Sequence, residues 1–142
     1  MFRKILQMKY EELTSKIIQA FFKVYNTLGY GFLEKVYRNA LYFEVIEMGL
    51  KAEMEKRILV YYKNHIVGDY SSDITVEDVI ICELKTAESL QEGDENQLIN
   101  YLKATNFEVG LLLNFGKKPE VRRKVYDNEK KFWRTTRIGQ IE

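Results

Sequence analysis

Cysteine, proline, histidine and tryptophan are almost absent from this sequence, which has one of each among 142 residues. A single cysteine excludes an internal disulfide, and the single histidine beside it leaves too few ligands for a zinc cluster. No apolar run reaches the length of a membrane span, and the N-terminus is too charged to resemble a signal peptide. We therefore expect a cytoplasmic protein with no membrane partner.

A large net charge of one sign is lacking as well. The formal net charge is +1, so an overall basic field gives no argument for a nucleic-acid partner. The charges are unevenly placed, however, because residues 117–137 hold nine Lys or Arg and three acids. Hydrophobic residues make up 46% and charged residues 30%, which is typical of a globular protein. We expect one domain over residues 1–142, with a basic tail at 117–142.

The first part of the sequence has the spacing of two helices. Apolar residues recur at helical intervals over 10–28, and the segment 29–31 (GYG) stops the pattern. A second helical pattern over 32–46 is followed by Gly49, whose position suits a left-handed C-cap.

After Gly49 the pattern changes toward the period of two that is typical of β-strands. The predicted elements are strands at 57–62, 66–76 and 79–84, a turn at 63–65, a helix from 92 to about 105, and a strand at 109–114. The first three strands form a meander, and the last is an unbroken apolar run typical of a central strand. The predicted order is α-α-β-β-β-α-β, followed by a tail that Pro119 opens.

The predicted strand 79–84 runs from apolar residues directly into Glu83-Leu84-Lys85. Glu83 and Lys85 are two residues apart, so their side chains leave one face of the strand while Cys82 and Leu84 leave the other. A charge buried without partners costs several kcal/mol. We therefore expect other charged groups to lie beside Glu83 and Lys85.

Asp73 is the first candidate partner, and its place depends on the turn at 77–78. A two-residue turn pairs Asp73 with Cys82, whereas a three-residue loop or a bulge pairs it with Glu83. We predict the second arrangement, because it gathers Asp73, Glu83 and Lys85. Two adjacent carboxylates repel each other unless a cation lies between them, and carboxylates with water suit Mg²⁺ or Mn²⁺.

Asp73 followed by Glu83-x-Lys85 resembles the active-site motif of the PD-(D/E)xK nuclease superfamily. The α-β-β-β-α-β order of that superfamily's core matches the order predicted above. The sequence departs from the motif at Ser72, where the superfamily's name implies proline.

Two further segments support this resemblance. Residues 31–37 (GFLEKVY) resemble the GxxExxY motif of a small family in this superfamily, and residues 97–101 (QLINY) resemble the QxxxY motif of its RecB-like and lambda-exonuclease-like branches. With residues 112–116 (LLNFG), the resemblance spans about 24–116. It implies an α/β, restriction-endonuclease-like core, which is a mixed sheet flanked by helices. The N-terminal helix and the basic C-terminal tail lie outside the recognised motifs and are additional to that core.

The resemblance also implies a metal site and a reaction. Asp73, Glu83 and the carbonyl of Leu84 would bind the metal, and Glu34 would be a further ligand reaching in from its helix. Lys85 and Gln97 would position and activate the attacking water, and Tyr101 would support Gln97 or contact the substrate. The expected reaction is metal-dependent hydrolysis of a phosphodiester, in DNA rather than RNA.

Other interpretations stay open. Glu34 fits a capping role at a helix start, and Gln97 with Tyr101 fits an ordinary helix face. The tail bases Arg122, Arg123 and Lys124 lie near aromatic residues, as in surfaces that bind nucleic acid, but a helix packing Val125, Phe132 and Trp133 on the domain would have the same pattern. The alternatives for the whole chain are a non-cleaving nucleic-acid-binding module and a structural homodimer.

Overall fold

The computed structural model describes residues 2–132 and 139–141, and describes side chains from Tyr10 to Phe132. The helices are α1 (Phe2–Leu28), α2 (Glu34–Glu47), α3 (Glu92–Ala104) and the short 3-10 helix η1 (Asn128–Lys130). The strands are β1 (Ala52–Met54), β2 (Arg57–Tyr62), β3 (His65–Ser71), β4 (Ile74–Val76), β5 (Ile80–Lys85), β6 (Val109–Phe115), β7 (Pro119–Val125) and β8 (Gly139–Ile141). The predicted α/β class is confirmed.

The strands form two sheets. One has five strands in the order β1-β4-β5-β6-β7, and the other has three in the order β3-β2-β8. In the larger sheet β5 and β6 are parallel, and the other neighbours are antiparallel. Helix α3 makes the crossover that a parallel pair needs. The predicted mixed sheet is confirmed.

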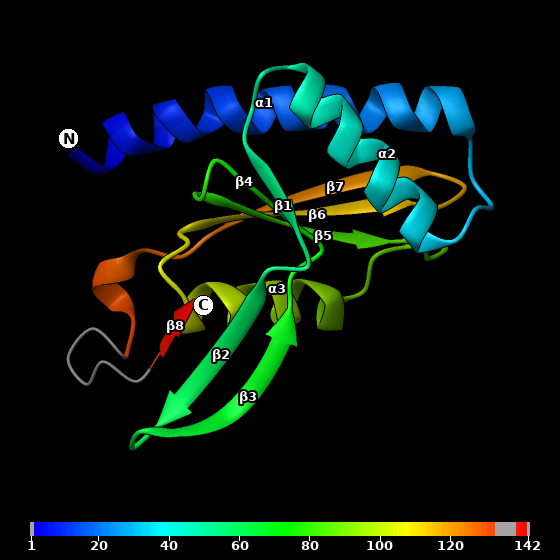
Figure 1. Cartoon of the computed structure of the whole chain (residues 1–142). Coiled ribbons are helices and arrows are strands. Elements are labelled where there is room, and N and C mark those ends of the chain that lie inside the picture. Colours follow the sequence, from blue (N-terminus) through cyan, green and yellow to red (C-terminus); the bar gives the residue numbers. More distant parts are fainter. Residues whose placement is uncertain (1, 133–138, 142) are drawn as a thin grey trace.

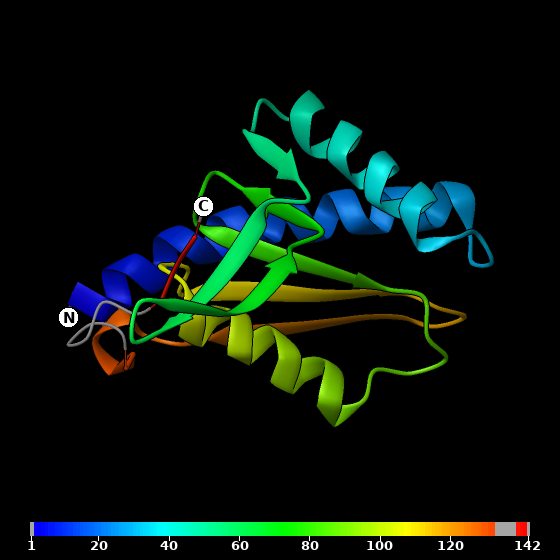
Figure 2. The same ribbon diagram turned by 60° about the horizontal axis from the view of Figure 1, so that its bottom comes forward.

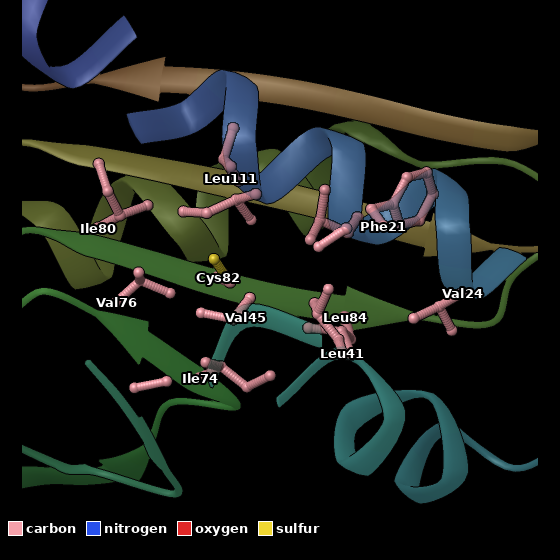
Figure 3. Close-up of a cluster of buried hydrophobic side chains, with 14 of the residues drawn as sticks. Phe21, Val24, Leu41, Val45, Ile74, Val76, Ile80, Cys82, Leu84 and Leu111 are labelled. Carbon is pink, nitrogen blue, oxygen red and sulfur yellow. The ribbon is translucent and has the colours of Figure 1, made fainter. Parts of the chain in front are cut away.

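Helices cover both faces of the larger sheet, with α1 and α2 on one face and α3 on the other (Figures 1 and 2). On the first face, Phe21 of α1 and Leu41 and Val45 of α2 pack with Cys82 and Leu111 in one buried cluster (Figure 3). Cys82, which alternation along the strand places on the face opposite Glu83, is a buried free thiol.

The cluster on the α3 face joins the two sheets. Leu98 and Leu102 of α3 pack against Ile81 of β5, and Ile58 of β2 belongs to the same cluster. All four side chains are fully buried. The smaller sheet is therefore attached to the domain through α3.

The loop between β4 and β5 sets the register of the candidate site. Residues 77–79 separate the two strands, and Ile74 pairs with Cys82. One step further along the pair, Asp73 lies beside Glu83. The predicted arrangement, which sets Asp73 beside Glu83, is confirmed, and of the two routes to it the chain uses the three-residue loop.

The single predicted strand at 66–76 is wrong. β3 ends at Ser71 in the smaller sheet, and β4 starts at Ile74 in the larger one. Between them the amide and hydroxyl of Ser72 donate to the carbonyl of Lys56, at 2.9 and 3.2 Å. The alternating sequence pattern continues across this junction and therefore gives no sign of the change of sheet. β1, which pairs with β4, was also missed because three residues are too short for a periodic pattern.

The helical interpretation of the tail is wrong for residues 119–125, which form β7 beside β6. Every residue of β6 is buried, so its backbone needs a paired strand on both sides. Further on, Lys131 is buried and its Nζ donates to the carbonyls of Thr105 and Phe107, at 2.7 and 2.6 Å. Trp133 lies outside the described residues.

The helices differ from the predictions mainly at their starts. α1 begins at Phe2 rather than Tyr10, since residues 2–9 contain neither proline nor glycine to stop it. α2 begins at Glu34, two residues later than predicted. Gly49 has a φ of 81°, so the predicted left-handed C-cap is confirmed. None of the helices in the described part of the chain has an apolar stretch that could cross a bilayer.

Candidate active site

Two acidic side chains meet where β4 begins and β5 ends. The N–H of Asp73 donates to Oε1 of Glu83 at 3.3 Å, and the N–H of Leu84 donates to Oδ2 of Asp73 at 2.7 Å. Side-chain oxygens thus accept the backbone hydrogen bonds at the end of the β4–β5 pairing. Because backbone groups hold them, both carboxyl groups have fixed positions.

The environment of this pair disfavours two negative charges. Burial raises the pKa of Glu83 well above its usual value, and the charge of Asp73 and a hydrogen bond between the two carboxyl groups raise it further. A cation beside the pair would remove both the burial penalty and the repulsion.

The carbonyl of Leu84 points toward the same side of β5 as the pair. In a strand the N–H and C=O of one residue point in one direction, and the N–H of Leu84 donates to Asp73. Ser72 would be the next partner opposite Leu84, but its N–H donates to Lys56 instead. The carbonyl of Leu84 is therefore directed to where the acids gather.

Glu34 approaches the pair from α2. Burial raises the pKa of Glu34, and the charge of Asp73 raises it further, whereas the charges of Lys85 and Arg38 lower it. Helix α2 contacts β5, and the charges of Asp73 and Lys85 act on the carboxyl group of Glu34. Glu34 is also the first residue of α2, so its charge is favourable to the helix dipole at the same time.

Tyr37 shapes the loop that leads to Glu34. Its side chain is fully buried, and its hydroxyl donates to the carbonyl of Gly29 at 2.6 Å and accepts from the N–H of Phe32 at 3.2 Å. Its ring stacks on Phe115 of β6, with centroids 4.4 Å apart. Tyr37 thus ties the glycine-containing loop to the core and positions Glu34.

Lys85 ends β5 and shares a face with Glu83. Its Nζ lies 3.9 Å from Oδ1 of Asp94, and its side chain is 33% exposed. Asp94 belongs to the first turn of α3, where its Oδ2 also accepts from the N–H of Gln91. The ammonium group therefore stands between β5 and α3, open in part to solvent.

Gln97 and Tyr101 bring α3 to the same site. Nε2 of Gln97 donates to the hydroxyl of Tyr101 at 2.7 Å. Burial raises the pKa of Tyr101, and the charges of Glu83 and Asp73 raise it as well. The pair is therefore coupled to the catalytic candidates on β5, although the amide of Gln97 remains exposed.

The sequence profile of the PD-(D/E)XK nuclease superfamily matches residues 11–124. The match includes Asp73, Glu83 and Lys85 and covers most of the chain. The chain belongs to the PD-(D/E)XK nuclease superfamily. No curated protein and no solved structure gives a significant match. The match also extends beyond the segment 24–116, into α1 on one side and β7 on the other.

PD-(D/E)XK nucleases generally use a divalent metal ion, usually Mg²⁺ or Mn²⁺. In the described part of this chain no three Asp, Glu, His or Cys side chains form a ready-made metal cage. Asp73, Glu83 and the Leu84 carbonyl nevertheless offer hard oxygen donors on one side of β5. Such an incomplete set fits Mg²⁺, which keeps several of its water ligands in proteins.

The departure at Ser72 has a local structural reason. Ser72 is 1% exposed, and its N–H donates to the carbonyl of Lys56 at 2.9 Å. Proline has no N–H and would lose this bond at the junction of the two sheets. Ser72 thus fixes the backbone just before Asp73 by a hydrogen bond.

The three tail bases are divided between the two faces of β7. Arg122 pairs with Leu112, on the α3 face, and Arg123 pairs with Leu111, on the α1 face. Lys124 is on the face of Arg122, and its Nζ forms an ion pair with Glu95 of α3 at 2.6 Å; Arg122 is exposed beside Glu120. Arg123 is thus separated from the other two bases.

Sequence reasoning missed three residues near the site. Asp94 looked like an acid of the helix start, and only the packing of α3 shows its approach to Lys85. Asn114 holds the loop after β5 through both atoms of its amide, bonding Ala87 N–H and C=O at 2.9 Å each. Tyr70 lies on β3 with its ring centroid 5.4 Å from that of Tyr101. Of these three residues, only Asn114 had a sequence signal, because it is a polar residue near the end of the apolar run of β6.

Proposed function

We propose that this chain is a metal-dependent nuclease that hydrolyses phosphodiester bonds in DNA, with Mg²⁺ or Mn²⁺ as its cofactor. The observation that supports the proposal most directly is the hydrogen bond from the N–H of Asp73 to the carboxylate of Glu83, which lies on the strand that ends in Lys85. Membership in the nuclease superfamily gives the reaction class.

In this proposal Asp73, Glu83 and the carbonyl of Leu84 hold the metal ion, and Glu34 adds a carboxylate from α2. When bound, the ion supplies Lewis-acid polarisation of the phosphate and lowers the pKa of the attacking water. The raised pKa values of Glu83 and Glu34 support this assignment, because these acids are placed where a cation favours their charged forms.

Lys85 and Gln97 act on the water and on the phosphate. The ammonium group of Lys85 orients the attacking water and offsets the negative charge that develops on the phosphate. Gln97 positions the water from α3, and Tyr101 holds the side chain of Gln97 through their hydrogen bond.

The exposed base Arg122 and the neighbouring Lys124 are the candidates in the tail for binding the phosphate backbone. Both lie on the α3 face of β7, the face that carries Glu83 and Lys85 on β5. The side chain of Arg123 lies on the opposite face of β7, away from Glu83 and Lys85.

The first experiment compares cleavage of labelled single-stranded DNA, duplex DNA and RNA in Mg²⁺, Mn²⁺ or EDTA. We expect metal-dependent cleavage by the wild type and a loss of about 10²-fold or more in both Asp73→Asn and Lys85→Ala. Asp78→Asn and Lys51→Ala are matched controls, because these residues form an exposed ion pair at the other end of the β4–β5 hairpin. Both controls should cleave like the wild type.

Cleavage that persists in EDTA or in Asp73→Asn would contradict the proposed site. If the folded wild type cleaves none of the substrates but binds DNA with a strong dependence on salt, the chain is a binding module. A metal-induced rise in melting temperature without binding or cleavage would favour a structural role.

A further inference from the structure

A hollow of about 440 Å³ lies between α3 and the hairpin of β2 and β3. This volume is in the range of about 300–1,000 Å³ that ligand pockets occupy. The side chains that line it include Tyr70, Gln97, Asn100, Tyr101, Lys103 and Phe132, and we call it the Tyr70 hollow. Aromatic, amide and cationic groups are thus gathered around one opening.

The hairpin presents the ring of Tyr70 to this hollow. Tyr70 pairs with Ile58, whose side chain is buried against α3, so Tyr70 shares that face. Gly68 precedes it on the same face, and a Cβ there would lie 2.9 Å from the Tyr70 ring. The ring contacts Tyr101, yet Tyr70 remains 47% exposed. Part of an aromatic face is therefore held in place and open.

The Tyr70 hollow adjoins the catalytic candidates. Gln97 and Tyr101 line it and also form the hydrogen bond that brings α3 to the site. Tyr101 belongs to the buried cluster that contains Ile81, two residues before Glu83 on the same face of β5. Burial and the charges of Glu83 and Asp73 raise the pKa of Tyr101. A group bound in the hollow would therefore lie next to the phosphate held by the acids.

We propose that the Tyr70 hollow binds an unpaired nucleobase beside the phosphodiester that is cleaved, so that the substrate is single-stranded nucleic acid. This inference rests on the proposed function for the position of the phosphate. It goes beyond that function because it assigns a base-binding site and selects one class of nucleic acid.

The chemistry of the lining fits a nucleobase better than a purely apolar ligand. Aromatic side chains stack on the π-face of any base, and Tyr70 offers such a face. The amide of Asn100 carries a donor and an acceptor that match base edges, and its side chain is exposed. Lys103 supplies a positive charge for the adjoining backbone. Inside a duplex the neighbouring bases cover the π-faces and pairing occupies the Watson–Crick edges, so the hollow selects an unpaired base.

Binding in EDTA tests the base site without cleavage. The probe is a short single-stranded oligonucleotide that carries 2-aminopurine, whose fluorescence falls when the base stacks on an aromatic ring. We expect Tyr70→Ala to weaken binding on the order of 10-fold and to remove the quenching. Tyr70→Phe should keep both properties, because phenylalanine keeps the aromatic face.

Tyr62→Ala is the matched control, since Tyr62 is an exposed tyrosine of the same hairpin that does not line the hollow. It should bind like the wild type. If Tyr70→Ala melts too early to be tested, Tyr70→Leu fills the space without an aromatic face and should show the same loss. Unchanged affinity and quenching in these Tyr70 variants would overturn the proposal, as would equal affinity of the wild type for blunt duplex.

The outcomes separate this inference from the proposed function. Cleavage in Mg²⁺ together with Tyr70-independent binding would keep the nuclease and discard the base site. Quenching that depends on Tyr70, without cleavage by the wild type, would keep the base site and discard the nuclease.

Discussion

At the scale of single residues, the charge that Glu83 would need to bind a metal ion makes the metal-free protein less stable. Burial and the neighbouring Asp73 raise the pKa of Glu83 well above the usual value. The folded state therefore holds this proton more tightly than the unfolded state does. The stabilisation from this group is present below the ordinary glutamate pKa and is lost as the pH rises through the folded pKa. At neutral pH without metal, the charged form of Glu83 is unfavourable to folding.

Glu83→Gln should therefore stabilise the metal-free protein at neutral pH, by roughly 0.5–2 kcal/mol. Mg²⁺ should raise the melting temperature of the wild type but not that of the variant, because the variant lacks one carboxylate ligand. Thermal unfolding in EDTA and in Mg²⁺ measures both effects. Glu53→Gln, on a partly exposed glutamate of β1, is the control and should respond to Mg²⁺ like the wild type. A less stable Glu83→Gln in EDTA would contradict the prediction.

At the scale of elements, the end of β6 positions the loop that follows the catalytic strand. Asn114 makes two hydrogen bonds to the backbone of Ala87, two residues after Lys85. Gly116 lies so close to this loop that an added Cβ would be 2.0 Å from the carbonyl oxygen of Ala87. The close approach of two backbones thus links β6 to the loop after β5.

Gly116→Ala should push this loop away and destabilise the fold by about 1–3 kcal/mol. Cleavage should fall as well, because the loop continues directly from Lys85. Urea unfolding and the cleavage assay measure the two effects. Gly93→Ala is the control: nothing lies within 4 Å of an added Cβ in this first turn of α3, and alanine favours a helix. Equal stability and activity of the wild type and Gly116→Ala would show that the loop moves freely.

At the scale of the whole molecule, the two sheets differ in how far their strands are buried. β6 lies inside the larger sheet between β5 and β7, and all of its residues are buried. β3 is an edge strand of the smaller sheet, and no residue of it is buried. The candidate site joins the two sheets, because the chain passes from β3 to β4 at Ser72 and Asp73.

In native-state hydrogen exchange, the amides of the larger sheet should be better protected than those of β3 in the smaller sheet. Amides of β5 and β6 should exchange only through global unfolding, since opening them exposes both hydrophobic clusters. Amides of β3 should exchange through local opening, with much lower protection. Exchange followed by mass spectrometry measures both regions in one sample. Equal protection of β3 and β6 would show that the hairpin opens only with the whole domain.

The sequence by itself determined the helices, the central strand β6, the register of Asp73 with Glu83 and the resemblance to the superfamily. These features are local, because they depend on hydrophobic period, on turn length and on short motifs. The register followed from one further argument, that Glu83 and Lys85 need charged neighbours. Cys82 could be assigned to the core for the same local reason, since it alternates with Glu83 along β5.

Only the tertiary structure decided which segments share a sheet and what surrounds the acids. The period of two is the same in β3 and β4, so the sequence could not show that the chain changes sheet at Ser72. Residues 119–125 of the tail became a strand because β6 needed a partner for its backbone groups. In that strand Arg122 and Arg123 lie on opposite faces. The packing of α3 brought Asp94 to Lys85 and Tyr101 to Tyr70. Contacts between residues far apart in sequence leave no periodic trace, which is why the candidate base site emerged only from the fold.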